Sequence, residues 1–94
     1  MEQAPAIELL ESTHTFPGPY TFKVIGRSER GFAARAVAAV RDELACEVDP
    51  PYKTRDARGG QHVAVTLEPR VESALQVLAV YRRLRDMSGL VMLW

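Results

Sequence analysis

An alternating stretch that leads directly into a helical one constrains this chain more than any other feature. Pro17 and Pro19 favour extended backbone, and side chains then alternate in character over residues 20–25 until Gly26. With Ser28 as a plausible N-cap, residues 29–45 predict a helix, because apolar residues recur every four positions. The repeating residues are Phe32, Ala36, Val40 and Leu44. The sequence therefore predicts a strand followed at once by a helix.

A glycine pair and a second helical pattern predict the remaining elements. Gly59-Gly60 indicates a hairpin, and any strand before it starts after Pro51, because proline cannot donate to a sheet. Pro69 suits the first turn of a second helix. The predicted elements are strands over 52–55, 61–68 and 90–94 and a helix over 70–85.

The order strand, helix, strand, strand, helix, strand predicts an α+β fold. Each strand–helix–strand half needs a right-handed crossover, which places both helices on one face of a four-stranded antiparallel sheet. The expected result is a ferredoxin-like βαββαβ sandwich with spatial strand order 4-1-3-2. The second and fourth strands then form the two edges of the sheet, where a preceding proline pair is tolerated.

The chain length of 94 residues predicts one domain. We expect residues 1–15 to be a flexible lead-in with a turn of helix over 7–10, and residues 16–94 to form the domain. The uncovered face of the sheet is expected to be mixed rather than strongly apolar or basic. The predicted core holds Phe22, Val24, Val63, Val65 and Leu67 below Phe32, Val37, Val40, Leu78 and Tyr81.

The composition favours a cytoplasmic protein that does not enter a membrane. Twelve basic and twelve acidic residues cancel, so the excess of positive charge that drives sequence-independent nucleic-acid binding is absent. No apolar run approaches the roughly 20 residues that span a bilayer. A single cysteine, Cys46, leaves no internal disulfide to form.

The turn between the first strand and the first helix is one candidate site. Gly26, Arg27 and Arg30 would place backbone donors and two cations at a helix N-terminus, which suits a carboxylate or phosphate. The glycines have the spacing of a phosphate loop, but Phe32 stands where that motif requires lysine. An ordinary tight turn is the alternative interpretation.

The apolar last strand is a second candidate, this time for a protein partner. As an edge strand it invites pairing with another chain, with Val91, Leu93 and Trp94 as the expected contacts. The alternative is that Met92 and Trp94 complete the core.

No catalytic or metal-binding set is predicted. The two histidines and Cys46 lie on different predicted elements without ligand spacing, and no paired carboxylates or Ser/His/Asp set can be assembled. RNA recognition on this strand order needs exposed aromatic residues on the central strands, whereas Tyr20 and Phe22 are assigned to the core. Two basic clusters are interpreted as solvated charge, with an acidic partner or nucleic acid as alternatives. They are Lys53, Arg55 and Arg58, and Arg82, Arg83 and Arg85.

Three separated stretches resemble the YbeD-like family of small bacterial proteins of unknown function. They are residues 16–26, residues 59–66, and residues 81–84 together with 90–93. None of these motifs is catalytic, so the resemblance implies a fold similar to the small-molecule-binding regulatory (ACT-type) domains and no activity. Val91 departs from the family pattern, because a basic residue is expected there.

These observations predict a small non-enzymatic binding or regulatory module of ACT-like build. It is expected to need no cofactor or metal and to act through a protein partner, a homodimer or a small-molecule effector. The alternative function is nucleic-acid binding by a ferredoxin-like domain through its arginine clusters.

Overall fold

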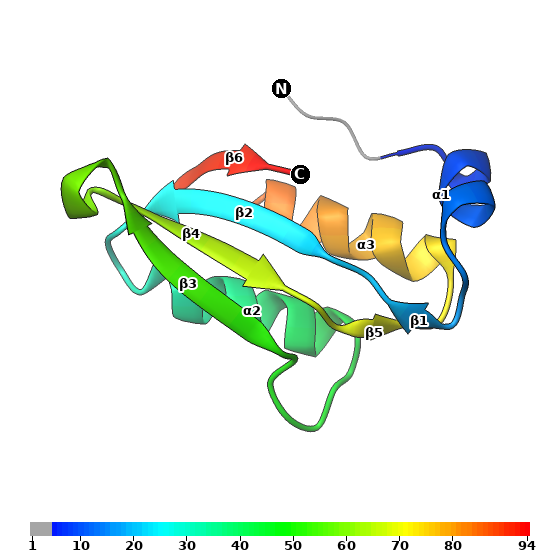
Figure 1. Cartoon of the computed structure of the whole chain (residues 1–94). Coiled ribbons are helices and arrows are strands. Elements are labelled where there is room, and N and C mark those ends of the chain that lie inside the picture. The colour runs from blue at the N-terminus through cyan, green and yellow to red at the C-terminus, as the bar shows by residue number, and fades with distance from the viewer. Residues whose placement is uncertain (1–4) are drawn as a thin grey trace.

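A four-stranded antiparallel sheet forms the centre of the molecule (Figure 1). The computed structural model describes residues 5–94, so residues 1–4 of the predicted lead-in lie outside the described part. The strands lie in the spatial order β3-β4-β2-β6, which is the predicted order 4-1-3-2 when these four are numbered along the chain. Their bounds are Phe22–Arg27 for β2, Tyr52–Ala57 for β3, His62–Leu67 for β4 and Leu90–Leu93 for β6.

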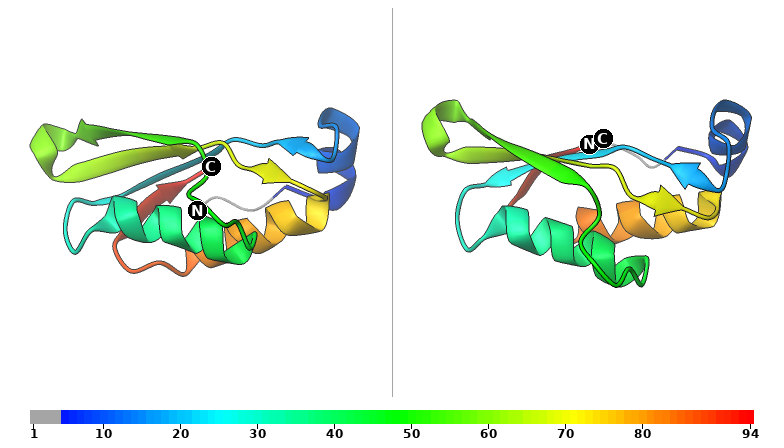
Figure 2. Two further views of the ribbon diagram at one scale, coloured as in Figure 1. Left: turned by 90° about the horizontal axis from the view of Figure 1, so that it is seen from below. Right: turned by 60° about the horizontal axis from the view of Figure 1, so that its bottom comes forward.

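Two helices, α2 (Phe32–Glu43) and α3 (Ala74–Arg85), lie side by side on one face of this sheet (Figure 2). No described helix covers the opposite face (Figure 2). The described helices include none that is long and apolar enough to cross a membrane. The mixed α+β class that the sequence predicts is therefore confirmed.

The core between sheet and helices contains most of the residues predicted for it. Val63 and Leu78 are only partly buried and pack at its border. The other predicted core residues are all buried, namely Phe22, Val24, Phe32, Val37, Val40, Val65, Leu67 and Tyr81. Alternation along strands and four-residue spacing along helices therefore identified most of the predicted inward-facing side chains correctly, although Val80 and Val71 are buried as well.

Helix α2 begins later than the sequence predicts, because the strand before it ends later, at Arg27. Its N-cap is Gly31, which adopts the left-handed conformation (φ 64°) and makes no side-chain capping bond. The predicted cap, Ser28, instead donates its backbone N–H to the carbonyl of Gln61 at 2.9 Å. The prediction of Ser28 as the cap is therefore wrong, because its backbone still forms a hydrogen bond with the segment just before β4.

A second, two-stranded sheet pairs β1 (Gly18–Pro19) with β5 (Arg70–Val71) and was not predicted. The carbonyl of Pro69 accepts a hydrogen bond from the Tyr20 N–H at 3.0 Å, so Pro69 does not open a helix. Helix α3 begins only after Ser73, whose side-chain oxygen accepts a hydrogen bond from a backbone N–H of the first turn.

Helix α1 (Ile7–Thr13) occupies the described part of the predicted lead-in and is longer than the single turn expected there. Leu10 is only 1% exposed and belongs to the core, whereas Leu9 is 57% exposed. Helix α1 contacts α3 at the end of the molecule that carries β1 and β5 (Figure 1). The segment thus docks on the domain through Leu10, and the partly buried Ile7 also packs against the core.

A pair of tyrosines lies buried in the core. The hydroxyl groups of Tyr20 and Tyr81 are 3.1 Å apart and share a hydrogen bond. Burial, and then this bond, raise the pKa of Tyr81 well above that of a free tyrosine. The folded state therefore holds the Tyr81 proton more tightly than the unfolded chain does.

We expect this proton linkage to lower the stability of the fold at alkaline pH. Below about pH 10 Tyr81 is protonated in both states, whereas above it the unfolded chain ionises first and is stabilised relative to the folded state. The free energy of unfolding should fall by up to about 1.4 kcal/mol per pH unit for this group. Urea denaturation between pH 8 and pH 11 should give a shallower decline for Tyr81→Phe. The control Tyr52→Phe removes an exposed hydroxyl, and equal slopes in all three proteins would contradict the prediction.

Candidate functional site

The uncovered face of the four-stranded sheet gathers side chains from all four strands. Residues opposite each other in antiparallel strands point to the same side of a sheet, so the strand register defines rows across this face. One row holds Lys53, Thr66 and Lys23, and the next holds Arg55, Ala64, Ile25 and Met92. Trp94 extends the first row, because its backbone exchanges two hydrogen bonds with Lys23, at 2.8 and 3.1 Å.

These rows surround a hollow of about 510 Å³. Its floor is low because Ala64 and Thr66, on the inner strand β4, carry small side chains. Longer side chains from β2 and β3 form its walls, and Trp94 lies at its far end. We call the lining residues the basic face: Lys23, Ile25, Lys53, Thr54, Arg55, Ala64, Thr66 and Trp94.

The charge of the residues that line this hollow is positive. Three cations line the hollow, and no carboxylate is among its lining residues. Within the described chain, no ion pair involves Lys23, Lys53 or Arg55, whereas Arg41 and Arg83 on the helices pair with carboxylates. The expectation of a mixed face omitted the two cations that β3 contributes, and the lining combines these cations with apolar and hydroxyl side chains.

The spacing of these cations follows from sheet geometry. Neighbouring strands lie about 4.8 Å apart, so Lys23 and Lys53, with β4 between them, start about 10 Å apart. Lys53 and Arg55 are two residues apart on one strand, which is about 7 Å. The three long side chains can therefore converge above the small floor, where they could hold a carboxylate or phosphate group.

The three residues of the predicted corner, Gly26, Arg27 and Arg30, lie in different environments in the structure. Gly26 lies inside β2, buried, and a Cβ atom there would overlap the ring of Phe32. Packing therefore requires this glycine, and it does not face a ligand at the corner. Arg27 ends β2 and Arg30 follows in the loop, both exposed.

A side chain that sequence reasoning did not single out holds the same corner together. The guanidinium of Arg35 donates to the carbonyls of Arg30 at 3.0 Å and Ser88 at 3.1 Å, and it lies 5.6 Å from the Phe32 ring centre. With Glu29 also lining it, the hollow at this corner, about 220 Å³, contains both signs of charge. We regard the corner as a structural junction between two loops.

The three residues predicted to contact a partner at the edge strand β6 differ in their exposure to solvent. Val91 and Trp94 are exposed, at 44% and 49%, but Leu93 is 5% exposed and belongs to the core. The side chain of Leu93 is therefore not available for a partner. The alternative that Met92 and Trp94 complete the core is wrong, because both are exposed. Trp94 belongs instead to the basic face.

The two basic clusters noted in the sequence lie on different surfaces. Lys53 and Arg55 belong to the basic face, and Arg58 lies in η1 (Arg58–Gly60), the short 3-10 turn between β3 and β4. The other cluster is on α3, on the opposite side of the sheet, where Arg83 forms an ion pair with Glu43 at 3.2 Å. They do not form one continuous basic surface.

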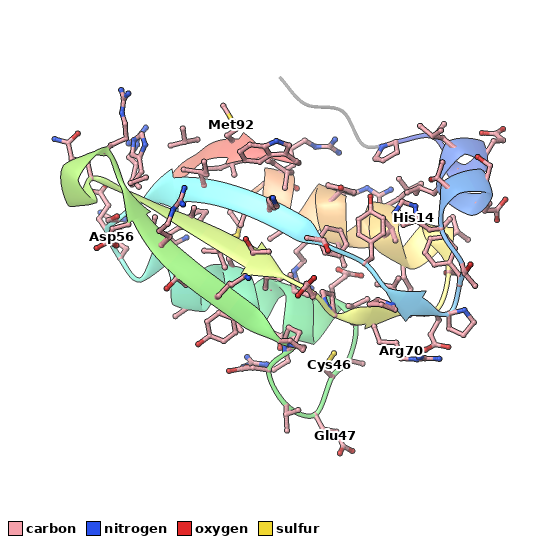
Figure 3. The ribbon with its side chains drawn as sticks, in the orientation of Figure 1. His14, Cys46, Glu47, Asp56, Arg70 and Met92 are labelled. Carbon is pink, nitrogen blue, oxygen red and sulfur yellow. The ribbon has the colours of Figure 1, made fainter. Side chains whose placement is uncertain are left out.

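The groups with metal-binding chemistry are dispersed. His14, at the end of α1, and Cys46, in the loop after α2, lie in different parts of the molecule (Figure 3). The His14 ring is tilted against the ring of Tyr20, with ring centres 4.8 Å apart. Across residues 5–94, no three His, Cys, Asp or Glu side chains are grouped to hold a metal ion.

Comparison with known proteins identifies the family. The model of the family described as "Protein of unknown function (DUF493)" matches residues 11–93. A UPF0250 protein of Paraburkholderia phytofirmans is 35% identical over 75 residues, which cover 79% of this chain and 83% of the relative. A UPF0250 protein of Nitrosomonas europaea is 25% identical over 83 residues, or 88% and 95% of the two chains. The YbeD-like resemblance is thereby confirmed, and the chain belongs to the DUF493 family of proteins of unknown function.

Proposed function

We propose that this protein is a small, non-enzymatic binding module that acts by holding an anionic partner on its basic face. The architecture we propose is ferredoxin-like and similar to ACT-type regulatory domains, and the location is the cytoplasm. Two helices on one face of a sheet with order β3-β4-β2-β6 support this architecture. In such a module, binding on the free face of the sheet regulates the partner protein.

The basic face carries the proposal, because three cations and no carboxylate line its hollow. Two like charges 7–10 Å apart in water repel by about 0.5 kcal/mol, a small cost that the fold tolerates. An anion within 4 Å of each cation gains about 1 kcal/mol from each of them in water, and more where water is excluded. Lys23, Lys53 and Arg55 together therefore favour a ligand with two or more negative charges.

The same charge argument limits the choice of partner. Two copies of the chain cannot join their basic faces without bringing six cations together, so self-association through this face is disfavoured. We propose instead an anionic effector or an acidic segment of another protein. Nucleic acid is disfavoured because the cluster on α3 lies on the other side of the sheet.

Thermal denaturation at low salt tests the proposal with inorganic pyrophosphate, citrate and a glutamate-rich peptide as probes. A ligand at ten times its Kd stabilises by about 1.4 kcal/mol, which raises the Tm of a domain of this size by about 6–11 °C. We expect at least one probe to do so, and Lys53→Gln/Arg55→Gln to abolish most of the shift. The control Arg82→Gln/Arg85→Gln removes the same charge from α3 and should retain it. Equal shifts in both variants, or no shift with any probe, would contradict the proposal.

A further inference from the structure

Trp94 places an aromatic surface beside the cations of the basic face. Its ring lines the same hollow, and its side chain is 49% exposed. The two backbone hydrogen bonds to Lys23 fix Trp94 in the sheet, so the ring and the Lys23 side chain are neighbours in one row. The hollow therefore combines a planar apolar surface with one positive charge beside it, from Lys23, and two more on β3, from Lys53 and Arg55.

The number of aromatic residues limits what this hollow can bind. Trp94 is the only aromatic residue that lines it. Tyr52, on the neighbouring edge strand, is 50% exposed but pairs with Leu67, so it belongs to the helix side of the sheet. A single-stranded nucleic acid needs successive stacking surfaces along its path, whereas one ring suits one base. The arrangement thus matches a single nucleotide unit better than a strand.

The arrangement of the cations also suits a compact anionic group better than the extended phosphate backbone of a nucleic acid. Lys23, Lys53 and Arg55 surround Ala64 and Thr66 and do not follow a line along the sheet. Lysine ammonium and arginine guanidinium groups are the usual protein partners of phosphate oxygens. A diphosphate or triphosphate presents several such oxygens at one point, where all three side chains can reach it.

We propose that the ligand of the basic face is a nucleoside polyphosphate, with its base on Trp94 and its phosphates among Lys23, Lys53 and Arg55. This inference rests on the proposed function and adds to it the chemical class of the ligand. The face recognises the planar base and the clustered negative charge together, so each alone binds more weakly.

The single tryptophan of the chain provides a direct measurement. ADP should quench Trp94 fluorescence, excited where adenine does not absorb, and should bind about tenfold more tightly than pyrophosphate, since stacking on an aromatic side chain contributes at this level. Pyrophosphate, which lacks the base, should bind without quenching by stacking. Adenosine, which lacks the charge, should bind at least about tenfold more weakly than ADP.

Variants of the full chain, studied by calorimetry, separate the two parts of the site. Trp94→Leu should reduce ADP affinity to that of pyrophosphate, and Lys53→Gln/Arg55→Gln should weaken both ligands by about tenfold. The matched control Tyr52→Leu removes an equally exposed aromatic residue from the helix side and should leave binding unchanged. Citrate binding that equals ADP binding, with no effect of Trp94→Leu, would overturn this inference and leave the proposed function standing. Tighter binding of an oligothymidine than of ADP to this face would overturn it in favour of nucleic acid.

Discussion

Replacing Gly26 with alanine is expected to destabilise the fold by about 2–3 kcal/mol, because the added methyl group overlaps a buried ring. The ring of Phe32 occupies the position that a Cβ atom of residue 26 would take. Movement of the ring is limited, since it is buried and the guanidinium of Arg35 lies over it, 5.6 Å from the ring centre. Small domains are stable by only about 5–15 kcal/mol, so the loss is a large fraction of the total.

A double-mutant cycle measures whether this contact is the cause. Phe32→Ala alone should cost about 3–5 kcal/mol through loss of buried surface and the cavity left behind. In that background Gly26→Ala should cost almost nothing, which gives a coupling energy of about 2 kcal/mol between the two sites. Urea denaturation of the four proteins checks this, and Phe32→Leu replaces Phe32→Ala if the latter does not fold. Additive losses would show that the glycine is required for another reason.

Gly26 also shows what local sequence patterns could and could not predict. The alternation before it correctly predicted a strand and its inward side, because that pattern depends on neighbouring residues alone. Its end was predicted at Gly26 because glycine usually interrupts strands, whereas β2 continues to Arg27. The sequence alone does not distinguish a glycine that makes room for a ring, as Gly26 does for Phe32, from a glycine that ends a strand.

Longer-range pairing accounts for the other differences in the fold. Pro69 is a common first residue of a helix, so the prediction of a helix from residue 70 followed a sound local rule. Strand β5 forms there because it pairs with β1, about fifty residues earlier in the chain. Nothing in the composition of either two-residue strand indicates the other.

The basic face could not be predicted for a related reason. Its cations were each visible in the sequence, but they were assigned to separate groups and interpreted as solvated charge. Only the register of β3 and β2 against β4 shows that Lys53, Thr66 and Lys23 share a row. A slip of one residue in either pairing would turn the cations of that strand to the other side of the sheet. The site thus depends on register, which short patterns do not determine.

The position of helix α1 bears on where the folded domain begins. The sequence suggested a flexible lead-in, because the segment has one short apolar stretch and several acidic residues. In the structure Leu10 is as deeply buried as the centre of the sheet, and α1 contacts α3. If this docking persists in solution, the segment contributes to the stability of the whole domain.

Leu10→Ala is accordingly expected to lower the free energy of unfolding by about 2–4 kcal/mol, through lost burial and an unfilled cavity beneath α3. Leu9→Ala is the matched control, because it removes the same atoms from the same helix at a position that is 57% exposed. That substitution should change stability by less than about 0.5 kcal/mol. Urea denaturation of both variants decides the question. Similar small losses at the two positions would mean that α1 detaches from the domain in solution, whereas a large loss confined to Leu10 makes the helix part of the cooperative fold.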